Sequence, residues 1–155
     1  MTNFIGEYDV KLDVKGRLSL PAGLLKQIPD AMKNKFIVNR SVFQKCLVLH
    51  TTESWEEIIK DLSKLNRFVK KNDDFIRIYT NGAVLVEVDS ANRLLLPKRL
   101  AEYAGIDKDV IMFCSLNKIE IWDAKKYNDM NTNIDPDAFG ALAEDVMGNL
   151  KNDNE

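Results

Sequence analysis

A nine-residue segment occurs twice in the chain and constrains how the rest can fold. Asp13–Pro21 has the sequence DVKGRLSLP and Asp89–Pro97 has DSANRLLLP, so the second copy begins 76 residues after the first. Each copy has an Asp, two variable residues, a residue that tolerates a left-handed backbone, an Arg, a short apolar stretch and a Pro. Repetition at a fixed spacing is the signature of a duplicated structural unit. We therefore expect two related halves.

The residue types of this unit predict a tight turn that enters a strand. The Asp of each copy can accept hydrogen bonds from backbone amides two residues further on, and Gly16 or Asn92 supplies the positive φ that the turn needs. Because side chains alternate along a strand, Arg17 and Arg93 should lie opposite the inward-facing leucines that follow them. Each copy should thus aim one guanidinium outward from a rigid corner. The final Pro of each copy suits the first position of a following helix.

The same order of elements is predicted in both halves: strand, strand, short helix, hairpin. In the first half these elements are residues 4–13, 18–20, 24–28, 36–39 and 46–50, and in the second half 83–88, 94–96, 98–104, 110–114 and 119–122. Neither half is expected to bury both faces of its sheet alone, so the two should interleave into one β-barrel. The predicted class is α+β, mainly β, with peripheral helices.

Helices are predicted between the halves and after them. Apolar residues recur at helical spacing over 55–69, where Ser54 and Glu57 form a capping box, and a shorter helical piece is expected at 74–79. Pro136 opens a last amphipathic helix. The predicted division is a first repeat at 5–53, connecting helices at 54–80, a second repeat at 81–125, and a C-terminal helix and tail at 126–155.

The charge of the chain is unevenly distributed, although the net charge is only −2. Residues 1–77 carry 14 Lys and Arg against 10 Asp and Glu, residues 78–128 carry seven of each, and residues 129–155 carry one Lys against seven acids. The basic first part is compatible with a polyanionic partner but does not establish one. No apolar run approaches the roughly 18–20 residues of a membrane span, and no signal-peptide pattern is present, so we expect no membrane association and a cytoplasmic location.

Little in the sequence points to catalysis or to a metal site. His50 is the single histidine, and Cys46 and Cys114 lie in apolar segments without CxxC spacing, which favours reduced core thiols. The chain has no GxGxxG, GxxxxGK[ST] or HExxH motif. We expect no enzyme activity, no cofactor, no metal and no small-molecule substrate. A small enzyme is the disfavoured alternative, and it would require a pocket that gathers His50 with two carboxylates.

With the two corners placed, the chain resembles the MraZ family of bacterial transcriptional regulators, whose members carry two copies of an AbrB-like swapped-hairpin unit. The resemblance rests on FIGEYDVKLDVKGRLSLP near the start, EVDSANRLLLP in the middle and IEIWDAKKY near the end, in that order and spacing. It covers nearly the whole chain. It implies tandem AbrB-like swapped-hairpin repeats that interleave into one pseudo-twofold β-barrel.

The resemblance also implies a function: a sequence-specific DNA-binding regulator of its own cell-wall and division operon, which binds repeated promoter boxes at the nucleoid as a ring-shaped homo-oligomer. In the family these loops face DNA, which carries over to Lys15, Arg17 and Arg93 as DNA-binding residues. The turn-forming residues of the same loops are Asp13, Gly16, Asp89 and Asn92. Asn92 stands where the family pattern usually has Gly, which leaves open whether the second loop contacts DNA. The target sequence, the direction of regulation and the ring size also stay open.

Several alternatives remain at the level of the residues. Arg17 and Arg93 can read guanine bidentately, clamp a phosphate, or merely pair with acids and hold the turn, whereas Lys15 is favoured as a phosphate contact. Because one barrel offers few positive charges, we expect several subunits to bind several boxes together. The rival function is an antitoxin-like protein-binding module of the same fold. Such a module should have a disordered tail that folds on its partner, and the predicted C-terminal helix argues against it.

Overall fold

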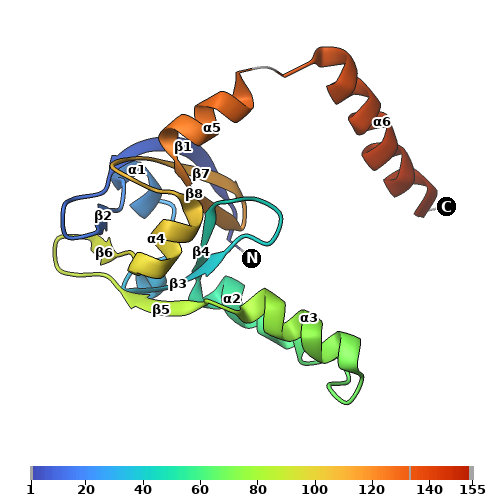
Figure 1. Cartoon of the computed structure of the whole chain (residues 1–155), viewed down its shortest axis with the longest axis horizontal. Helices are drawn as coiled ribbons and strands as arrows, with labels where there is room; N and C mark the ends of the chain where they lie inside the picture. The colour runs from blue at the N-terminus through green and yellow to red at the C-terminus, as the bar shows by residue number, and fades with distance from the viewer. Residues whose placement is uncertain (1, 133, 154–155) are drawn as a thin grey trace. The chain divides into compact units, whose positions relative to one another are not determined.

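The protein is described by a computed structural model that covers residues 2–132 and 134–153 (Figure 1). The chain divides into two compact units, residues 1–124 and residues 125–155. The second unit holds nearly all of α5 (Ala124–Asn131) and the whole of α6 (Pro136–Asp153). The Pro at the first helical position of α6 confirms the predicted start of this helix. Among the described residues, none of the helices has the length and apolarity needed to span a membrane.

A six-stranded antiparallel sheet forms the framework of the first unit, counted over the described residues. In sheet order its strands are β1 (Phe4–Lys11), β7 (Asp109–Leu116), β8 (Lys118–Asp123), β4 (Leu47–Thr51), β3 (Lys35–Arg40) and β5 (Val84–Glu87). Strands β1 and β5 are equivalent in the two halves, as are β7 and β3, and β8 and β4. The first strand of each half pairs with the hairpin of the other half, so the two halves interleave in the sheet as expected.

The duplicated segments form a separate two-stranded antiparallel ribbon of β2 (Arg17–Ser19) and β6 (Arg93–Leu95). Leu18 lies directly opposite Leu94, its own counterpart in the other half. This register relates the two ribbon strands by a local twofold axis that passes between Leu18 and Leu94. In Figure 1 the ribbon and both corners lie at the left edge, on the side away from the connecting helices.

The predicted closed barrel is not confirmed. The six-stranded sheet ends at β1 and β5, and within residues 2–132 and 134–153 these edge strands do not pair with each other. The ribbon is tied to them only by isolated bridges, from Leu12 to Leu18 and from Val88 to Leu94. The chain turns at each corner directly after such a bridge, so neither edge strand continues far enough to build a full ladder with the ribbon. The fold is mixed α and β with an open sheet.

Helices α1 (Ala22–Leu25) and α4 (Lys98–Ala104) follow the two ribbon strands. Pro21 and Pro97 directly precede these helices and do not occupy their first positions, which is a one-residue difference from the prediction. Gly105 ends α4 with a left-handed φ of 63°, a conformation that glycine adopts without a steric penalty. A single 3₁₀ turn follows α1 before β3 begins.

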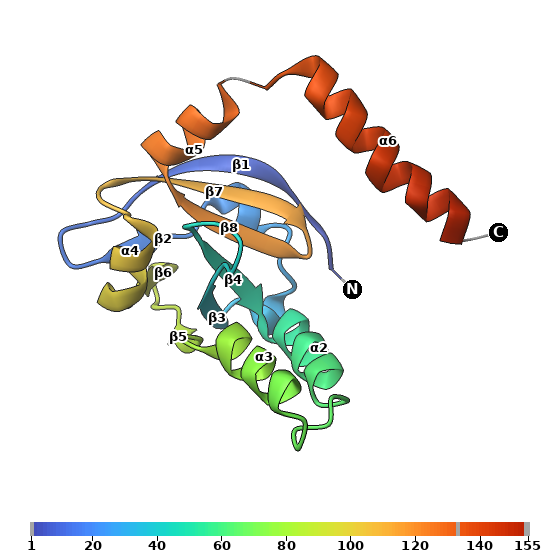
Figure 2. The ribbon, with the colours of Figure 1, turned by 45° about the vertical axis from the view of Figure 1, so that its right-hand side comes forward.

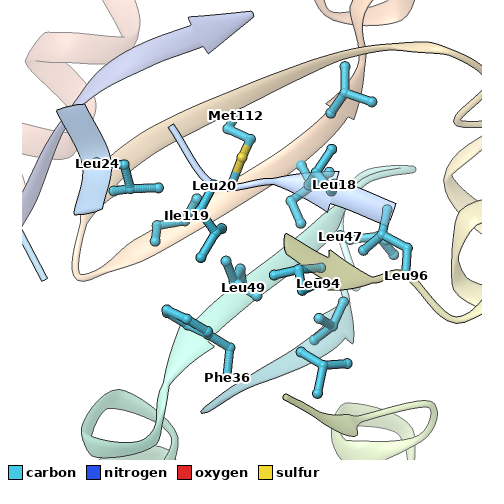
Figure 3. Packing of buried hydrophobic residues seen from close by; sticks show 14 of the residues in the cluster. Leu18, Leu20, Leu24, Phe36, Leu47, Leu49, Leu94, Leu96, Met112 and Ile119 are labelled. Carbon is cyan, nitrogen blue, oxygen red and sulfur yellow. The ribbon is translucent and has the colours of Figure 1, made fainter. Parts of the chain in front are cut away.

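The core combines side chains from both halves of the chain, as Figure 3 shows. Leu18 is 0% exposed and Leu94 is 1% exposed, and both belong to the same buried cluster as Phe36, Leu49 and Met112. Burying a leucine side chain stabilises the folded state by roughly 1.5–3 kcal/mol. The ribbon is therefore anchored by its inward face, which leaves the outward face free to carry polar side chains.

Two helices connect the halves, α2 (Thr52–Leu62) and α3 (Lys70–Thr80), and they lie side by side (Figure 1, Figure 2). The prediction of one helix that continues to Val69 is wrong, because α2 ends seven residues earlier. The predicted capping box is wrong as well. Thr51 is the N-cap of α2, and its side-chain oxygen accepts a hydrogen bond from the backbone N–H of Ser54 at 3.1 Å. Both residues suit an N-cap, and the helix begins directly after β4.

Cys46 and Cys114 are buried and free, which confirms the prediction of core thiols. Burial raises the pKa of the Cys46 thiol to about 12 and that of the Cys114 thiol to about 11. Neither group is therefore a reactive thiolate at neutral pH.

Candidate nucleic-acid interface

The first corner is closed by hydrogen bonds that converge on Asp13. Its carboxylate oxygen Oδ1 accepts from the backbone N–H of Lys15 at 2.9 Å and of Arg17 at 2.8 Å. Its backbone carbonyl accepts from the N–H of Gly16 at 2.9 Å, and its own N–H donates to the Arg17 carbonyl at 2.9 Å. The predicted role of this Asp as a turn former is confirmed by these contacts. One side chain thus fixes the backbone of the whole loop.

The second corner repeats this network almost bond for bond. Asp89 Oδ1 accepts from the N–H of Ala91 and of Arg93, both at 2.9 Å. The Asp89 carbonyl accepts from the N–H of Asn92 at 3.0 Å, and the Asp89 N–H donates to the Arg93 carbonyl at 2.9 Å. Asn92 has a φ of 60° and Gly16 a φ of 81°, so both lie in the left-handed region. The replacement of Gly by Asn therefore leaves the corner's geometry intact, as the tolerance of Asn for this region allows.

The two corners are also bonded to the opposite half. Leu96 donates its backbone N–H to the Gly16 carbonyl, and Leu20 donates its backbone N–H to the Asn92 carbonyl, both at 2.9 Å. These reciprocal bonds extend the ribbon by one position at each end. Each corner is therefore held in place by the strand of its counterpart, which makes the pair a single rigid unit.

Both arginines lie on the outward face of the ribbon. Arg17 is opposite Leu95 and Arg93 is opposite Ser19, while the buried leucines occupy the other face. The two arginines are thus diagonal neighbours, whose backbones lie roughly 7–8 Å apart in an antiparallel pair. This confirms the prediction that the arginines lie on the face of the ribbon that points away from the inward-facing leucines.

Each guanidinium is held by the Asp of its own corner but keeps most of its donors available. Arg17 Nε donates to Asp13 Oδ2 at 2.7 Å, and Arg93 Nε donates to Asp89 Oδ2 at 2.9 Å. A guanidinium has five N–H donors, and among the described residues the four on the terminal nitrogens of each have no partner. The ion pair considered from the sequence is therefore present in both corners. It orients each arginine through Nε and leaves the terminal nitrogens available to a ligand.

The two carboxylates stay ionised while they hold the arginines. The hydrogen bond from the Arg17 backbone lowers the pKa of Asp13, and the side-chain bond and charge of the same arginine act in the same direction. The Arg93 backbone bond likewise lowers the pKa of Asp89. Both corners are therefore intact at neutral pH.

Lys15 lies at the exposed tip of the first corner, beside a groove that continues along α4. Further lysines on this groove are Lys98, at the start of α4, and Lys108, just before β7, together with the acid Asp107. The sequence analysis did not identify Lys98 or Lys108. No local pattern marks them, because they reach the first corner only through the pairing of the two halves.

His50 lies in a small separate pocket whose described lining includes Arg40, Tyr79 and Lys118 but no carboxylate. Burial lowers the pKa of the His50 imidazole to about 4, and the nearby Lys118 charge acts in the same direction. The pocket therefore lacks the pair of acids that the enzymatic alternative requires. In the part of the chain that the structure describes, no group of three or more His, Cys, Asp or Glu is arranged to hold a metal ion.

Comparison with known protein families gives a match over most of the chain. The model of the family described as MraZ protein, antitoxin-like, matches residues 3–78 and again residues 80–148. The two matches separate at residue 79, in the last turn of α3, close to the boundary of the two halves.

Relatives with similar sequences carry one shared name. A protein of Christiangramia forsetii named transcriptional regulator MraZ is 47% identical over 149 residues, which is 96% of this chain and 96% of that protein. The protein of the same name from Flavobacterium psychrophilum is 44% identical and covers 99% of this chain and 97% of its own length. The one from Clostridium beijerinckii is 35% identical over 92% of this chain and 98% of its own length.

Proposed function

This chain belongs to the MraZ family, and we propose that it is a transcriptional regulator that binds double-stranded promoter DNA through its two corners. The names of the relatives support the regulatory role. The contact with DNA is the function that the geometry of the corners supports best. Lys15, Arg17 and Arg93 bind the DNA, and the four turn-forming residues position them.

The observation that carries this proposal is the pair of forked donors on one face of a rigid ribbon. The major groove of B-DNA, about 12 Å wide, admits a two-stranded ribbon. Arg17 and Arg93 project from such a ribbon, each with its terminal nitrogens unpaired among the described residues. Because each arginine is already oriented by its Asp, little rotamer entropy is lost on binding. An arginine fork fits the O6 and N7 acceptors of guanine, so we assign base recognition to these two residues.

The proposed architecture of the DNA-binding unit is the swapped hairpin. Each half would contribute a first strand, a corner and a ribbon strand to a barrel-like unit that is related by a pseudo-twofold axis. The pairing of Leu18 with Leu94 and the reciprocal corner bonds support this arrangement. The edge strands β1 and β5 are joined to the ribbon only by isolated bridges. The ribbon would therefore complete the barrel by side-chain packing and not by a continuous hydrogen-bonded ladder.

We further propose that the chain acts as a ring-shaped homo-oligomer on repeated boxes upstream of its own cell-wall and division operon. Large apolar side chains are exposed on and beside α3: Phe75 is 52%, Ile78 is 59% and Phe68 is 101% exposed. Contiguous exposed apolar surface is typical of interaction sites. Linked binding of several subunits to successive boxes would raise the affinity well above that of one subunit.

The test is binding of the purified chain to promoter fragments that carry one, two or three copies of the box, with a shuffled duplex as control. We expect the affinity to rise with the number of boxes, and light scattering to show an oligomer. Equal affinity for one box and three boxes would contradict multivalent binding. Failure to retard any fragment at low ionic strength would contradict DNA binding altogether.

An antitoxin-like role is the second candidate, and the wording of the matched family description favours it. Exposed apolar residues on α6, such as Phe139 and Val146, also suit a protein contact. The helical state of α6 counts against a tail that folds only on its partner. This candidate predicts that the chain alone does not distinguish the promoter fragment from the shuffled duplex.

A further inference from the structure

The surfaces beside the two corners differ in charge although the corner backbones match. Beside the first corner, the groove carries Lys15, Lys98 and Lys108, all exposed, and one acid, Asp107, that has no ion-pair partner among the described residues. The other acid on this groove, Asp13, is already paired with an arginine. The groove is therefore a locally cationic surface on a chain whose net charge is negative.

The duplication identifies the counterpart of each groove lysine beside the second corner. Lys15 corresponds to Ala91, the same position of the repeated segment, and Lys98 corresponds to Ala22, because each directly follows the Pro before its helix. These two lysines thus have no charged equivalent.

The third counterpart follows from matching hydrogen bonds. The Lys108 carbonyl accepts from the N–H of Leu12 at 2.8 Å, and the Asn34 carbonyl accepts from the N–H of Val88 at 2.9 Å. Because Leu12 and Val88 are equivalent residues, Lys108 corresponds to Asn34. All three lysines of the groove are therefore absent from the equivalent surface.

The acid of the groove is also replaced. Asp107 directly precedes Lys108 and so corresponds to Lys33. The Lys33 ammonium is paired with the Asp30 carboxylate at 2.8 Å, so this cation is already bound to an acid.

We propose that this groove holds a segment of the DNA phosphate backbone, and that it does so on one side of the pseudo-twofold axis only. The inference rests on the proposed DNA-binding function and deepens it. The corners are two equal scaffolds, whereas the phosphate contacts extend from the first corner alone. Each subunit therefore binds its box in one orientation, because the reversed orientation would place the phosphate backbone against a surface that lacks these three lysines.

The size of the effect follows from counterion release. Each phosphate neutralised on B-DNA contributes about 0.9 to the slope of log K against log salt. Three lysines in contact with phosphates would contribute roughly 2.7 to the slope for each bound subunit. Such a change is measurable by titration of a labelled duplex over a range of salt concentrations.

The test replaces the groove lysines by their own counterparts. The variant Lys15→Ala, Lys98→Ala, Lys108→Asn gives the surface beside the first corner the residues found beside the second corner. It removes three positive charges. The matched control removes three exposed lysines away from the groove: Lys26, Lys60 and Lys71, each changed to Ala. Circular dichroism should show both variants folded, since every replaced side chain is exposed.

We expect the groove variant to lose most of this salt slope, while the control keeps a slope close to that of the unmodified chain. Ethylation interference should map contacted phosphates to one flank of the box for the unmodified chain and to neither flank for the groove variant. Adding Ala22→Lys, Asn34→Lys and Ala91→Lys to the groove variant should restore the slope and move the contacted phosphates to the opposite flank.

Equal slopes for the groove variant and the control, with specific binding intact, would overturn this inference and leave the proposed function standing. Interference at phosphates on both flanks of the box with the unmodified chain would also overturn it. If the unmodified chain does not bind the promoter fragment, the proposed function fails, and the inference fails with it.

Discussion

Replacement of Arg17 tests whether the corners read bases or only hold phosphates. Arg17→Ala removes the guanidinium, whereas Arg17→Lys keeps the charge and loses the planar fork. If the terminal nitrogens bind a guanine, both changes should weaken specific binding to a similar extent and leave non-specific binding largely unchanged. If they clamp a phosphate, the Lys variant should keep most of the affinity.

The magnitude depends on how many subunits bind. A bidentate arginine–guanine contact contributes about 1–3 kcal/mol of discrimination, which is roughly 5-fold to 150-fold in affinity. Each subunit supplies one Arg17, so a probe with two occupied boxes should lose about twice this free energy, roughly 30-fold to 20,000-fold. Arg93→Ala is expected to weaken binding less, because the three groove lysines have no charged counterparts beside the second corner.

The ion pair at the corner complicates the simple alanine variant. Arg17→Ala leaves the Asp13 carboxylate without its cation on the surface that faces DNA, so part of the loss would be repulsion between Asp13 and the phosphates. The double variant with Asp13→Asn corrects for this. The Asn side-chain oxygen can still accept the backbone N–H bonds of Lys15 and of residue 17, so the turn should persist.

The assay is fluorescence anisotropy with one-box, two-box and shuffled duplexes at fixed ionic strength. We expect the double variant with Asn at position 13 to bind the shuffled duplex like the unmodified chain and to lose its preference for the box. Binding of Arg17→Lys within twofold of the unmodified chain on every duplex would refute base recognition by this residue. A loss that is the same on one box and two boxes would refute the contribution of one arginine per subunit.

Further predictions concern the core and the buried titratable groups. Leu18→Ala and Leu94→Ala should each lower the free energy of unfolding by about 2–5 kcal/mol, measured by urea denaturation. Because the two leucines are direct partners, the double variant should depart from additivity. The low pKa of His50 in the folded state means that the unfolded state takes up its proton first, so stability should fall as the pH drops from about 6.5 to 4. His50→Phe should remove roughly 2–3 kcal/mol of this pH dependence; identical pH profiles would show that the imidazole is not buried. Cys46 and Cys114 should resist Ellman's reagent at pH 8 in the folded chain and react in urea.

The parts of the fold that the sequence predicts are those that local chemistry determines. The corners are of this kind, since an Asp, a left-handed residue and the following strand define them within five positions. The alternation of Leu18 and Leu94 with the arginines is equally local. The interleaving of the two halves was also predictable, because each half is too small to bury its own sheet and must pair with the other.

The incorrect predictions depend on packing that local patterns do not record. The helical periodicity over residues 55–69 continues past the end of α2, although the chain turns there to bring α3 alongside it. Thr51 and Ser54 are both good caps, and only the length of β4 decides between them. Lys98 and Lys108 belong to the second half in sequence and join the first corner only after the halves interleave.

The asymmetry between the corners arises at the positions that the turn does not use. Within each corner the hydrogen bonds involve the Asp, the left-handed residue, the Arg and the backbone of the residue between them. The side chains of Val14 and Lys15, and those of Ser90 and Ala91, are exposed and make none of these bonds. Charge can therefore change at these positions without disturbing the scaffold. In the proposed binding mode, the duplicated chain keeps two matching corners and binds DNA in one direction. The net negative charge does not prevent this, because three exposed lysines line the groove beside the first corner.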